Sequence, residues 1–434
     1  MAEAERKHGY TVPKWMKLDN AATIYPATWS KKLSAMFRYT VTLTEEIDPL
    51  LLEKAQAAAL QRMPYLCYRL RQGLFWCYFT QTPGMPEIRP DVNNPMIPID
   101  FKENKHFLFR VRWYGKRIAV EFFHAITDGE GGITFLLTMT AEYLRLKYGC
   151  HIPFTERILD PKGTPSPEET EDCFYRYAGK VGALEHEQAA YHQSGTVEPD
   201  HVLHIITGKI PVEPLKKAAK AAGCTITVFL ASVLTECFQI MQLQETSAGR
   251  RKKPIKIFIP INLRSFYPTR TMRNFSSYVN VGIESRLGEH SFPEIVSQLR
   301  SQLETVATEK RLNSKFTGNV RTAQNPFVRC IPMFIKKHIL SIAERMMGDR
   351  YCSTALSNMG NVVLPPEMMP YVTDFNCMLS RCRGKPGAAT CISYNGNLYM
   401  TFTRKIREAD LERLFFTKLV ERGIPVELES NQRK

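Results

Sequence analysis

The sequence predicts an α/β protein of the α+β type, built from two sandwich subdomains in which mixed sheets are flanked by helices. The chain has 434 residues, which suggests two domains at roughly 100–200 residues per domain. Strand and helix periodicities are mixed in both halves, and several strands pair in hairpins, which argues against a doubly wound parallel sheet. Residues 159–172 contain three prolines and several acids, a linker composition that divides the chain into 1–170 and 171–434.

In the first part, helix formers and alternating apolar residues define the elements. Leu, Ala and Gln between Pro49 and Pro64 favour a helix, because they lose little rotamer freedom there. Apolar residues at every second position of 107–113 predict one arm of a hairpin. The expected elements are a strand in 31–48, a helix over 49–64, two short strands in 65–81, a hairpin over 106–124 and a helix over 133–148.

The second part repeats this mixture. An Asn395-Gly396 dipeptide between two apolar runs predicts a tight hairpin turn. The expected elements are a strand in 201–211, two helices in 212–241, strands in 253–263 and 275–285, a long amphipathic helix over 292–312, a strand running into a turn in 351–362 and a hairpin over 387–405.

Composition narrows the class of protein. Hydrophobic residues make up 44% and aromatic residues 11% of the chain, which is typical of a globular protein with a large core. We expect no transmembrane segment, because no apolar run approaches roughly 18–20 residues. The first fifteen residues are charged and contain no apolar segment, so we expect no signal peptide. Eleven cysteines without a Cys-x-x-Cys pair predict reduced thiols, no bound metal and a cytoplasmic protein.

The net charge of +15 favours an anionic partner. The charge is expected to be spread over the chain, with one dense run, "GRRKKP" at 249–254, that we interpret mainly as a solvated loop. No zinc finger, aromatic RNA-binding motif or basic region joined to heptads is visible, so nucleic acid is not an expected partner.

A histidine ends the second arm of the 106–124 hairpin. Ile118, Val120, Phe122 and His124 are spaced by two, so they share one face of the strand, and "ITDGEGG" follows before the next helix. A histidine can accept a proton at neutral pH and return it, which makes His124 a candidate general base. The residues alone leave two alternatives open: a core histidine that caps a strand, and a zinc site that lacks an evident third ligand.

Several stretches resemble the CoA-dependent acyltransferase superfamily. "HAITDG" (124–129) is similar to its His-x-x-x-Asp-Gly motif, in the group that includes chloramphenicol acetyltransferase, condensation domains, plant acyltransferases, wax ester synthases and alcohol acetyltransferases. The resemblance covers nearly the whole chain, and the bacterial alcohol acetyltransferases are the most similar branch. The other segments are "WMKLDNAATIYPA" (15–27), "IPINLRSFYP" (259–268), "RNFSSYVN" (273–280) and "LSNMG" (356–360).

Three departures separate the chain from other branches. Condensation domains usually have a histidine where Phe123 stands, the Asp-Phe-Gly-Trp-Gly motif of the plant enzymes is absent, and we expect no attached carrier domain. A condensation-type enzyme with a carrier-bound donor or an amine acceptor, and a non-catalytic binding member, remain the alternatives.

The resemblance implies two chloramphenicol-acetyltransferase-like subdomains with a tunnel between them and His124 midway. Acyl-CoA, by default acetyl-CoA, would be the donor substrate, an alcohol the acceptor, and no cofactor would be bound permanently. Ser357, Asn358 or a backbone N–H of that turn are candidate oxyanion donors. The alternative for this pair is that it only makes a turn.

The motif aspartate in this superfamily pairs with an arginine and fixes the loop. For Asp128 we expect Arg264 as the partner, with Arg273 as the second candidate and Asn262 as support for the same segment. Gly129 is expected to leave room where a side chain would block access. Part of the positive charge, including Lys252 and Lys253, is a candidate contact for the CoA phosphates.

Residues 327–348 mix Phe, Ile, Met and Leu with Lys and Arg. We interpret them as an ordinary core-facing helix; a membrane-surface helix and a lid over an apolar tunnel are the alternatives, so membrane contact is not expected. A monomer is expected. The acyl chain and the acceptor depend on tunnel side chains that the sequence does not place.

Overall fold

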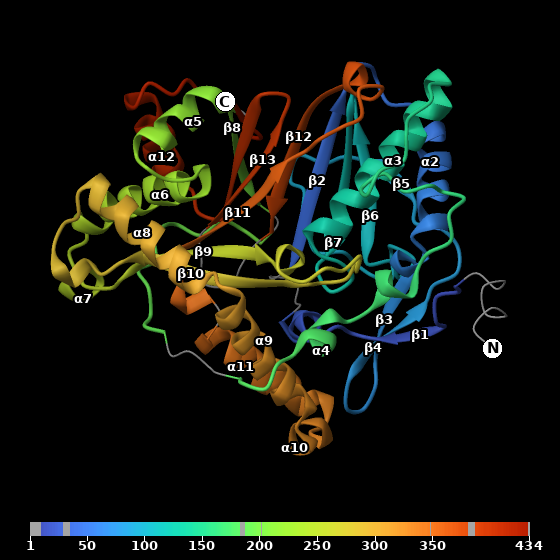
Figure 1. The fold of residues 1–434 in the computed structure, drawn as a ribbon, viewed down its shortest axis with the longest axis horizontal. Coiled ribbons are helices and arrows are strands. Elements are labelled where there is room, and N and C mark those ends of the chain that lie inside the picture. Colours follow the sequence, from blue (N-terminus) through green and yellow to red (C-terminus); the bar gives the residue numbers. More distant parts are fainter. Residues whose placement is uncertain are drawn as a thin grey trace.

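The computed structural model describes residues 10–28, 35–182, 187–200, 202–347, 349–380 and 387–432. In these residues the chain forms a three-stranded, a five-stranded and a seven-stranded sheet, with helices packed on the outside of the two larger ones (Figure 1). Most of the charged N-terminal stretch lies outside the described residues, so the expectation about a signal peptide has no structural counterpart.

The strands are β1 (Trp15–Lys17), β2 (Met36–Leu43), β3 (Tyr68–Gln72), β4 (Cys77–Gln81), β5 (Ile88–Pro90), β6 (Phe109–Tyr114), β7 (Arg117–Phe123), β8 (His204–Pro211), β9 (Ile255–Asn262), β10 (Ser276–Ile283), β11 (Thr354–Asn361), β12 (Val372–Leu379), β13 (Gly387–Tyr394), β14 (Asn397–Arg404) and β15 (Glu427–Ser430). The α-helices are α1 (Tyr25–Thr28), α2 (Pro49–Arg62), α3 (Gly129–Tyr148), α4 (Cys173–Tyr177), α5 (Val212–Ala221), α6 (Ile226–Leu243), α7 (Ala248–Arg251), α8 (Phe292–Val306), α9 (Glu309–Gln324), α10 (Pro326–Cys330), α11 (Met333–Met347) and α12 (Asp410–Glu421).

The five-stranded sheet, in the order β12-β2-β7-β6-β5, holds the histidine strand β7 at its centre. Helices α2 and α3 cover one face of it (Figure 1). Aromatic rings fill the space between the sheet and α3: Phe122 on β7 lies 5.1 Å from Phe37 and 6.0 Å from Phe135. Such ring pairs add roughly 0.5–1.5 kcal/mol each beyond the burial of their area, so the strand that ends at the histidine is firmly anchored.

Strand β7 also carries a fully buried carboxylate, Glu121. Arg38 on β2 and Arg110 on β6 lie directly opposite it in the strand register, and both guanidinium groups contact the carboxylate. The Met96 N–H donates a third hydrogen bond to it at 3.0 Å. A buried charge of this kind is tolerated only because its oxygens are paired, so these three strands depend on one another electrostatically.

The seven-stranded sheet, in the order β10-β9-β11-β13-β14-β8-β15, forms the second half. Strand β11 runs parallel to β9 and β13 and the other pairs are antiparallel, so the predicted mixed sheet is confirmed. Helix α6 lies against this sheet. Contrary to the sequence expectation, α6 is long and apolar enough to cross a membrane by length and composition, but 67% of it is buried inside the protein, as in a core helix.

The division at residue 170 needs a correction. Strand β12, from the second part, pairs with β2 and so belongs to the sheet of the first part. The presumed linker is not a free linker either: Glu169 is buried and forms a bidentate ion pair with Arg62 of α2 at 2.7 and 2.9 Å. Strand pairing over hundreds of residues joins the two halves, which a local composition signal does not reveal.

Three further expectations can be compared with the structure. The Asn395-Gly396 turn is confirmed, since both residues have positive φ, 46° and 75°. The long helix predicted over 292–312 is instead two helices, because α8 ends at Val306 and α9 begins at Glu309. The turn predicted at "LSNMG" was wrong for Ser357 and Asn358, which lie inside β11 just before a bulge.

Candidate active site around His124

His124 is the first residue after β7, and its N–H donates to the Ala35 carbonyl at 2.9 Å. Its half-buried ring stacks on Tyr25 at 4.9 Å and meets the edge of Phe37 at 5.0 Å. Phe37 also stacks on Phe122, so His124 shares the face that the alternation along the strand predicts. The two aromatic contacts fix the plane of the imidazole.

A chain of hydrogen bonds determines which ring nitrogen of His124 carries the proton. The His124 Nδ1 lies 2.9 Å from the Asn274 Oδ1, and the Asn274 Nδ2 donates to the Asp19 Oδ2 at 3.2 Å. Because the carboxylate takes the amide N–H, the amide oxygen faces the imidazole, and Nδ1 must donate to it. The neutral ring therefore carries its proton on Nδ1 and its lone pair on Nε2.

The acidic end of this chain is fully buried. Asp19 has no exposed area and accepts the Ala22 N–H at 2.7 Å. Burial raises the pKa of Asp19, and the Arg273 guanidinium, 3.6 Å away, opposes that rise. Burial and the neighbouring Asp19 together raise the pKa of Asp172 to about 7. Arg273, the second candidate partner of the motif aspartate, is thus placed on Asp19 instead.

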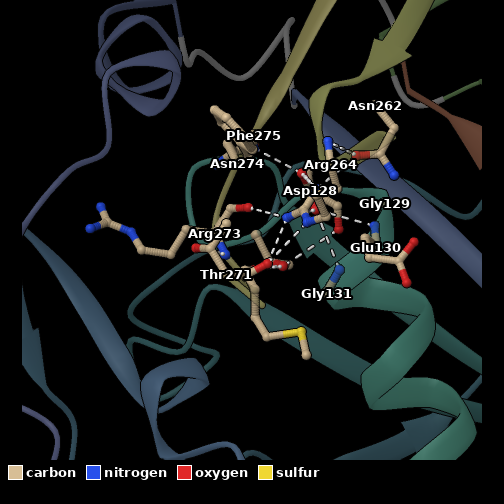
Figure 2. Close-up of polar contacts among 12 residues, drawn as sticks. Asp128, Gly129, Glu130, Gly131, Asn262, Arg264, Thr271, Arg273, Asn274 and Phe275 are labelled. Atoms are coloured by element: carbon tan, nitrogen blue, oxygen red, sulfur yellow. Dashed lines mark hydrogen bonds and ion pairs between the residues drawn. The ribbon is translucent and has the colours of Figure 1, made fainter. Parts of the chain in front are cut away.

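Asp128 joins two parts of the chain that are far apart in sequence (Figure 2). Its Oδ1 accepts the N–H groups of Glu130 and Gly131 at 3.1 and 3.3 Å and so caps the N-terminus of α3. Its Oδ2 lies 2.8 Å from the Arg264 Nη1 and accepts the Phe275 N–H at 2.9 Å. The structure contains the Asp128–Arg264 pair, and Asp128 also bonds directly to the backbone of the residue after Asn274.

Arg264 closes the segment 262–275 on itself. It donates to the Thr271 carbonyl through Nε and Nη2, at 3.1 and 2.8 Å, and to the Arg273 carbonyl at 2.7 Å. The Asn262 Oδ1 accepts from the backbone N–H of Arg264 and from the Arg264 Nη1. The ion pair therefore positions the backbone that carries Asn274, and through Asn274 it reaches the imidazole of the motif histidine.

The glycines of the loop permit close packing. A Cβ at Gly131 would lie 2.1 Å from the Thr127 Oγ1 and 2.5 Å from the Met272 carbonyl oxygen. A Cβ at Gly129 would lie 2.5 Å from the Met359 Cε, and the Tyr39 hydroxyl donates to the Gly129 carbonyl at 3.2 Å. The space at Gly129 is thus filled by protein, which corrects the expectation that it keeps an entrance open. Gly131 lets the segment with Asn274 approach α3.

The two residues expected on the oxyanion side point in different directions. The Asn358 amide donates to the Thr227 hydroxyl of α6 and its oxygen accepts the Gly360 N–H, both at 2.9 Å. Ser357, on the opposite face of β11, contacts the Met359 sulfur, and that side chain lies against Gly129. Of the two residues, Ser357 is the one that contacts a side chain lying against the motif loop, namely Met359.

Sequence reasoning missed Asn274, Asp19 and Tyr25 as functional candidates. All three lie in the quoted stretches 15–27 and 273–280, which was the available signal. The basic run 249–254 lies at the far edge from β7 (Figure 1), where Arg250 pairs with Glu245, so it is remote from His124. Among the described residues, no group of three or more His, Cys, Asp or Glu side chains is arranged to hold a metal ion.

Comparison with known proteins defines the class of fold. No protein-family model and no curated protein matches the chain. Solved structures do match it over nearly their full length. Polyketide synthase associated protein 5 from Mycobacterium tuberculosis is 15% identical with a TM-score of 0.57, covering 93% of this chain and 97% of the other.

Two further structures extend the comparison. The starter condensation domain of rhizomide synthetase, in complex with C8-CoA and Leu-SNAC, is 12% identical with a TM-score of 0.60, covering 94% and 95% of the two chains. Trichothecene 15-O-acetyltransferase from Fusarium sporotrichioides is 10% identical with a TM-score of 0.60, covering 95% and 96%. The chain therefore has the chloramphenicol-acetyltransferase-like fold shared by condensation domains and CoA-dependent acyltransferases, as its sequence predicts.

Proposed function

We propose that this protein is an acyltransferase that moves an acyl group from acyl-CoA to a hydroxyl acceptor, with His124 as the general base. The observation that carries the proposal is the chain His124–Asn274–Asp19, which leaves a lone pair on Nε2. A core histidine that only capped a strand would not require a buried carboxylate to orient the amide beside it. The fold, shared with an acetyltransferase and with a domain solved with C8-CoA, supports the reaction class.

The proposed reaction needs one proton carrier. The His124 Nε2 takes the proton of the acceptor hydroxyl while that oxygen attacks the thioester carbonyl carbon. The tetrahedral intermediate then expels the CoA thiolate as the C–S bond breaks, and the imidazolium returns the proton to sulfur. The products are an ester and free CoA, and no further reactant is required.

The imidazolium formed midway is stabilised through its other nitrogen. The Nδ1–H keeps its hydrogen bond to the Asn274 Oδ1, and the Asn274 amide N–H donates to the Asp19 carboxylate. Ser357 is our candidate for the oxyanion donor, because its hydroxyl contacts Met359, whose side chain lies against Gly129 of the motif loop. One such donor contributes roughly 10²–10³-fold. Asp128 and Arg264 are positioning residues: they hold the backbone segment that carries Asn274 and do not themselves contact His124.

The direct test is release of CoA thiol from acetyl-CoA in the presence of a panel of alcohols, with the ester identified by mass spectrometry. Release that depends on the alcohol and disappears in His124→Ala supports the proposal. His151→Ala, at an exposed histidine after α3, is the matched control and should behave as the wild type. Alcohol-dependent release that survives in His124→Ala would contradict the assignment of the base.

The second candidate is a condensation-type transfer to an amine, favoured by the likeness to a condensation domain solved with Leu-SNAC. The same lone pair on Nε2 would take a proton from the ammonium before attack, or from the amine nitrogen as it attacks the thioester carbonyl. An aminoacyl thioester offered with octanoyl-CoA would then yield an amide where the alcohols yield no ester. Absence of any product from both acceptor classes would favour a non-catalytic binding member of the fold.

A further inference from the structure

Helices α9, α10 and α11 form an arm that projects from one edge of the molecule (Figure 1). Its exposed side chains contradict the core-facing helix predicted for 327–348. Phe327 on α10 is 85% exposed and Phe334 on α11 is 63% exposed. Ile335, Ile339 and Ile342 are exposed as well.

The exposed residues described on α11 lie on one side of the helix. At about 100° per residue, Phe334, Ile335, Ile339 and Ile342 fall within a sector of about 140°. The opposite side faces the protein, where Met333 is buried and its N–H donates to the Leu74 carbonyl at 2.6 Å. An amphipathic helix normally turns its apolar stripe to the core, so apolar side chains on the outer side of α11 are not explained by packing within the protein.

A neighbouring hairpin extends this apolar surface. The loop between β3 and β4 is held at the start of α11, where the Lys336 Nζ donates to the Phe75 carbonyl at 2.8 Å. In that loop Leu74 is 65% and Trp76 is 52% exposed. Figure 1 shows this hairpin and α10 projecting toward the same side. We call the exposed apolar residues of α10, α11 and this hairpin tip the apolar face.

The arm is also strongly basic. Residues 310–343 contain seven Lys and Arg residues and no Asp or Glu, which is nearly half of the net charge of +15 in 34 residues. The sequence analysis expected the positive charge to be spread over the chain. Instead, a large part of it is concentrated in this arm. The seven are Lys310, Arg311, Lys315, Arg321, Arg329, Lys336 and Lys337.

We propose that the apolar face and the basic arm bind an anionic lipid membrane. Exposed Phe, Ile, Leu and Trp side chains beside clustered Lys and Arg are the combination by which a protein lies in the interface of a bilayer without spanning it. The apolar side chains enter the boundary between headgroups and acyl chains, and the exposed basic side chains, Arg311, Arg321 and Arg329 among them, meet the anionic headgroups. A purely nucleic-acid or acidic-protein contact would explain the charge but not large aromatic side chains turned to water on the same arm.

The binding test uses the full-length protein and flotation with vesicles of phosphatidylcholine, with and without phosphatidylglycerol. We expect the protein to float with the anionic vesicles, and less so as salt is raised. The variant Phe327→Ser/Phe334→Ser/Ile339→Ser should lose binding by at least about tenfold, since each buried apolar side chain adds to the affinity. Arg329→Gln/Lys337→Gln should weaken binding to anionic vesicles by about fivefold per charge.

Matched controls separate the surface from general effects. Leu287→Ser and Val363→Ser remove large side chains that are 74% and 77% exposed elsewhere, and they should bind as the wild type. Lys216→Gln/Lys217→Gln removes two exposed charges on α5 and is the control for charge. The melting temperature of the triple variant should stay unchanged, because the three side chains are exposed.

Three outcomes would overturn the proposal. They are no flotation of the wild type, equal flotation of the triple variant, and a wild-type dimer in solution that the triple variant converts to a monomer, which would make the occupant a second copy of this chain. None of these measurements depends on acyl transfer, so failure here leaves the proposed function standing. Helix α11 also packs on α1, whose Tyr25 stacks on His124, so lipid on the arm would lie next to an element that contacts the site.

Discussion

Replacing Asn274 by alanine tests the central step of the proposed mechanism. The change removes the oxygen that lies 2.9 Å from the His124 Nδ1 and the N–H that the Asp19 carboxylate accepts. The ring keeps its contacts with Tyr25 and Phe37, so it stays in its plane. What is lost is the preference for the proton on Nδ1, and with it the constant availability of the lone pair on Nε2.

The magnitude follows from the bonds removed. One hydrogen bond to a partly buried group contributes about 0.5–1.5 kcal/mol, and mixing of the two ring tautomers adds a similar amount. The two contributions together amount to about 1–3 kcal/mol, so at about 1.4 kcal/mol per tenfold change in rate Asn274→Ala should lower kcat/KM by about 5- to 150-fold. Most of this range lies below the roughly 10²–10⁴-fold expected when His124 itself is removed.

The assay has two readouts. Thiol release from acetyl-CoA gives kcat/KM, and nitrogen NMR of histidine-labelled protein reports which ring nitrogen of His124 carries the proton, without any substrate. The wild type should show the Nδ1–H form and Asn274→Ala a mixture. Asn274→Asp keeps an oxygen for Nδ1 and should recover part of the rate and most of the Nδ1–H form.

The reasoning would be refuted if Asn274→Ala kept the wild-type rate and the Nδ1–H form. His124 would then be oriented by some other contact. An unchanged tautomer with a large fall in rate would mean that Asn274 acts on the substrate and not on the imidazole.

Three other predictions follow from the same structure. If Asp128 acts through Asn274, Asp128→Asn should lower activity in a folded protein. The double variant Asp128→Asn/Asn274→Ala should then lose less activity than the product of the two single losses, which a double-mutant cycle measures. Gly131→Ala should lower the free energy of unfolding by about 1–3 kcal/mol in urea titration, because its Cβ would meet the Met272 carbonyl. Burial by itself raises the pKa of Glu121, but Arg110 and Arg38 outweigh it and bring the pKa down to about 2, so this group should cost about 3 kcal/mol of stability as the pH falls from 4.5 toward 2.

Each of these has a control and a contrary result. Gly249→Ala, at an open position of α7, is the control for Gly131→Ala, and equal stability of the two variants would contradict the packing argument. The folded pKa of Glu121 lies below its ordinary value of 4.5, so its contribution is present above pH 4.5 and is lost below it. Glu121→Gln should lower the unfolding free energy at neutral pH by about 3–5 kcal/mol and remove that part of the acid dependence. Simple multiplication of the Asp128 and Asn274 effects would mean that the two residues act independently.

Several features were readable from the sequence because they are local. The alternating strand before His124, the helix predicted over 133–148 and the turn at Asn395-Gly396 all depend on neighbours a few positions apart, although the helix begins four residues earlier than predicted, at Gly129. Residue period, capping side chains and turn residues act over that range, so the pattern determines the element. The pairing of Asp128 with Arg264 was predicted from a motif resemblance, not from any local pattern.

The tertiary structure decided what the elements meet. Asn274 is 150 residues from His124 and 255 from Asp19, and no local pattern encodes that contact. Strand β12 likewise pairs with β2 of the first sheet, and no local pattern encodes that choice, because the two strands are far apart in the sequence. The mixture of apolar and basic residues in 327–348 predicted one core-facing helix; the structure has two helices there, α10 and α11, and composition does not say which side of a helix is covered. Only the packing of α11 on the body of the protein left its apolar side facing water.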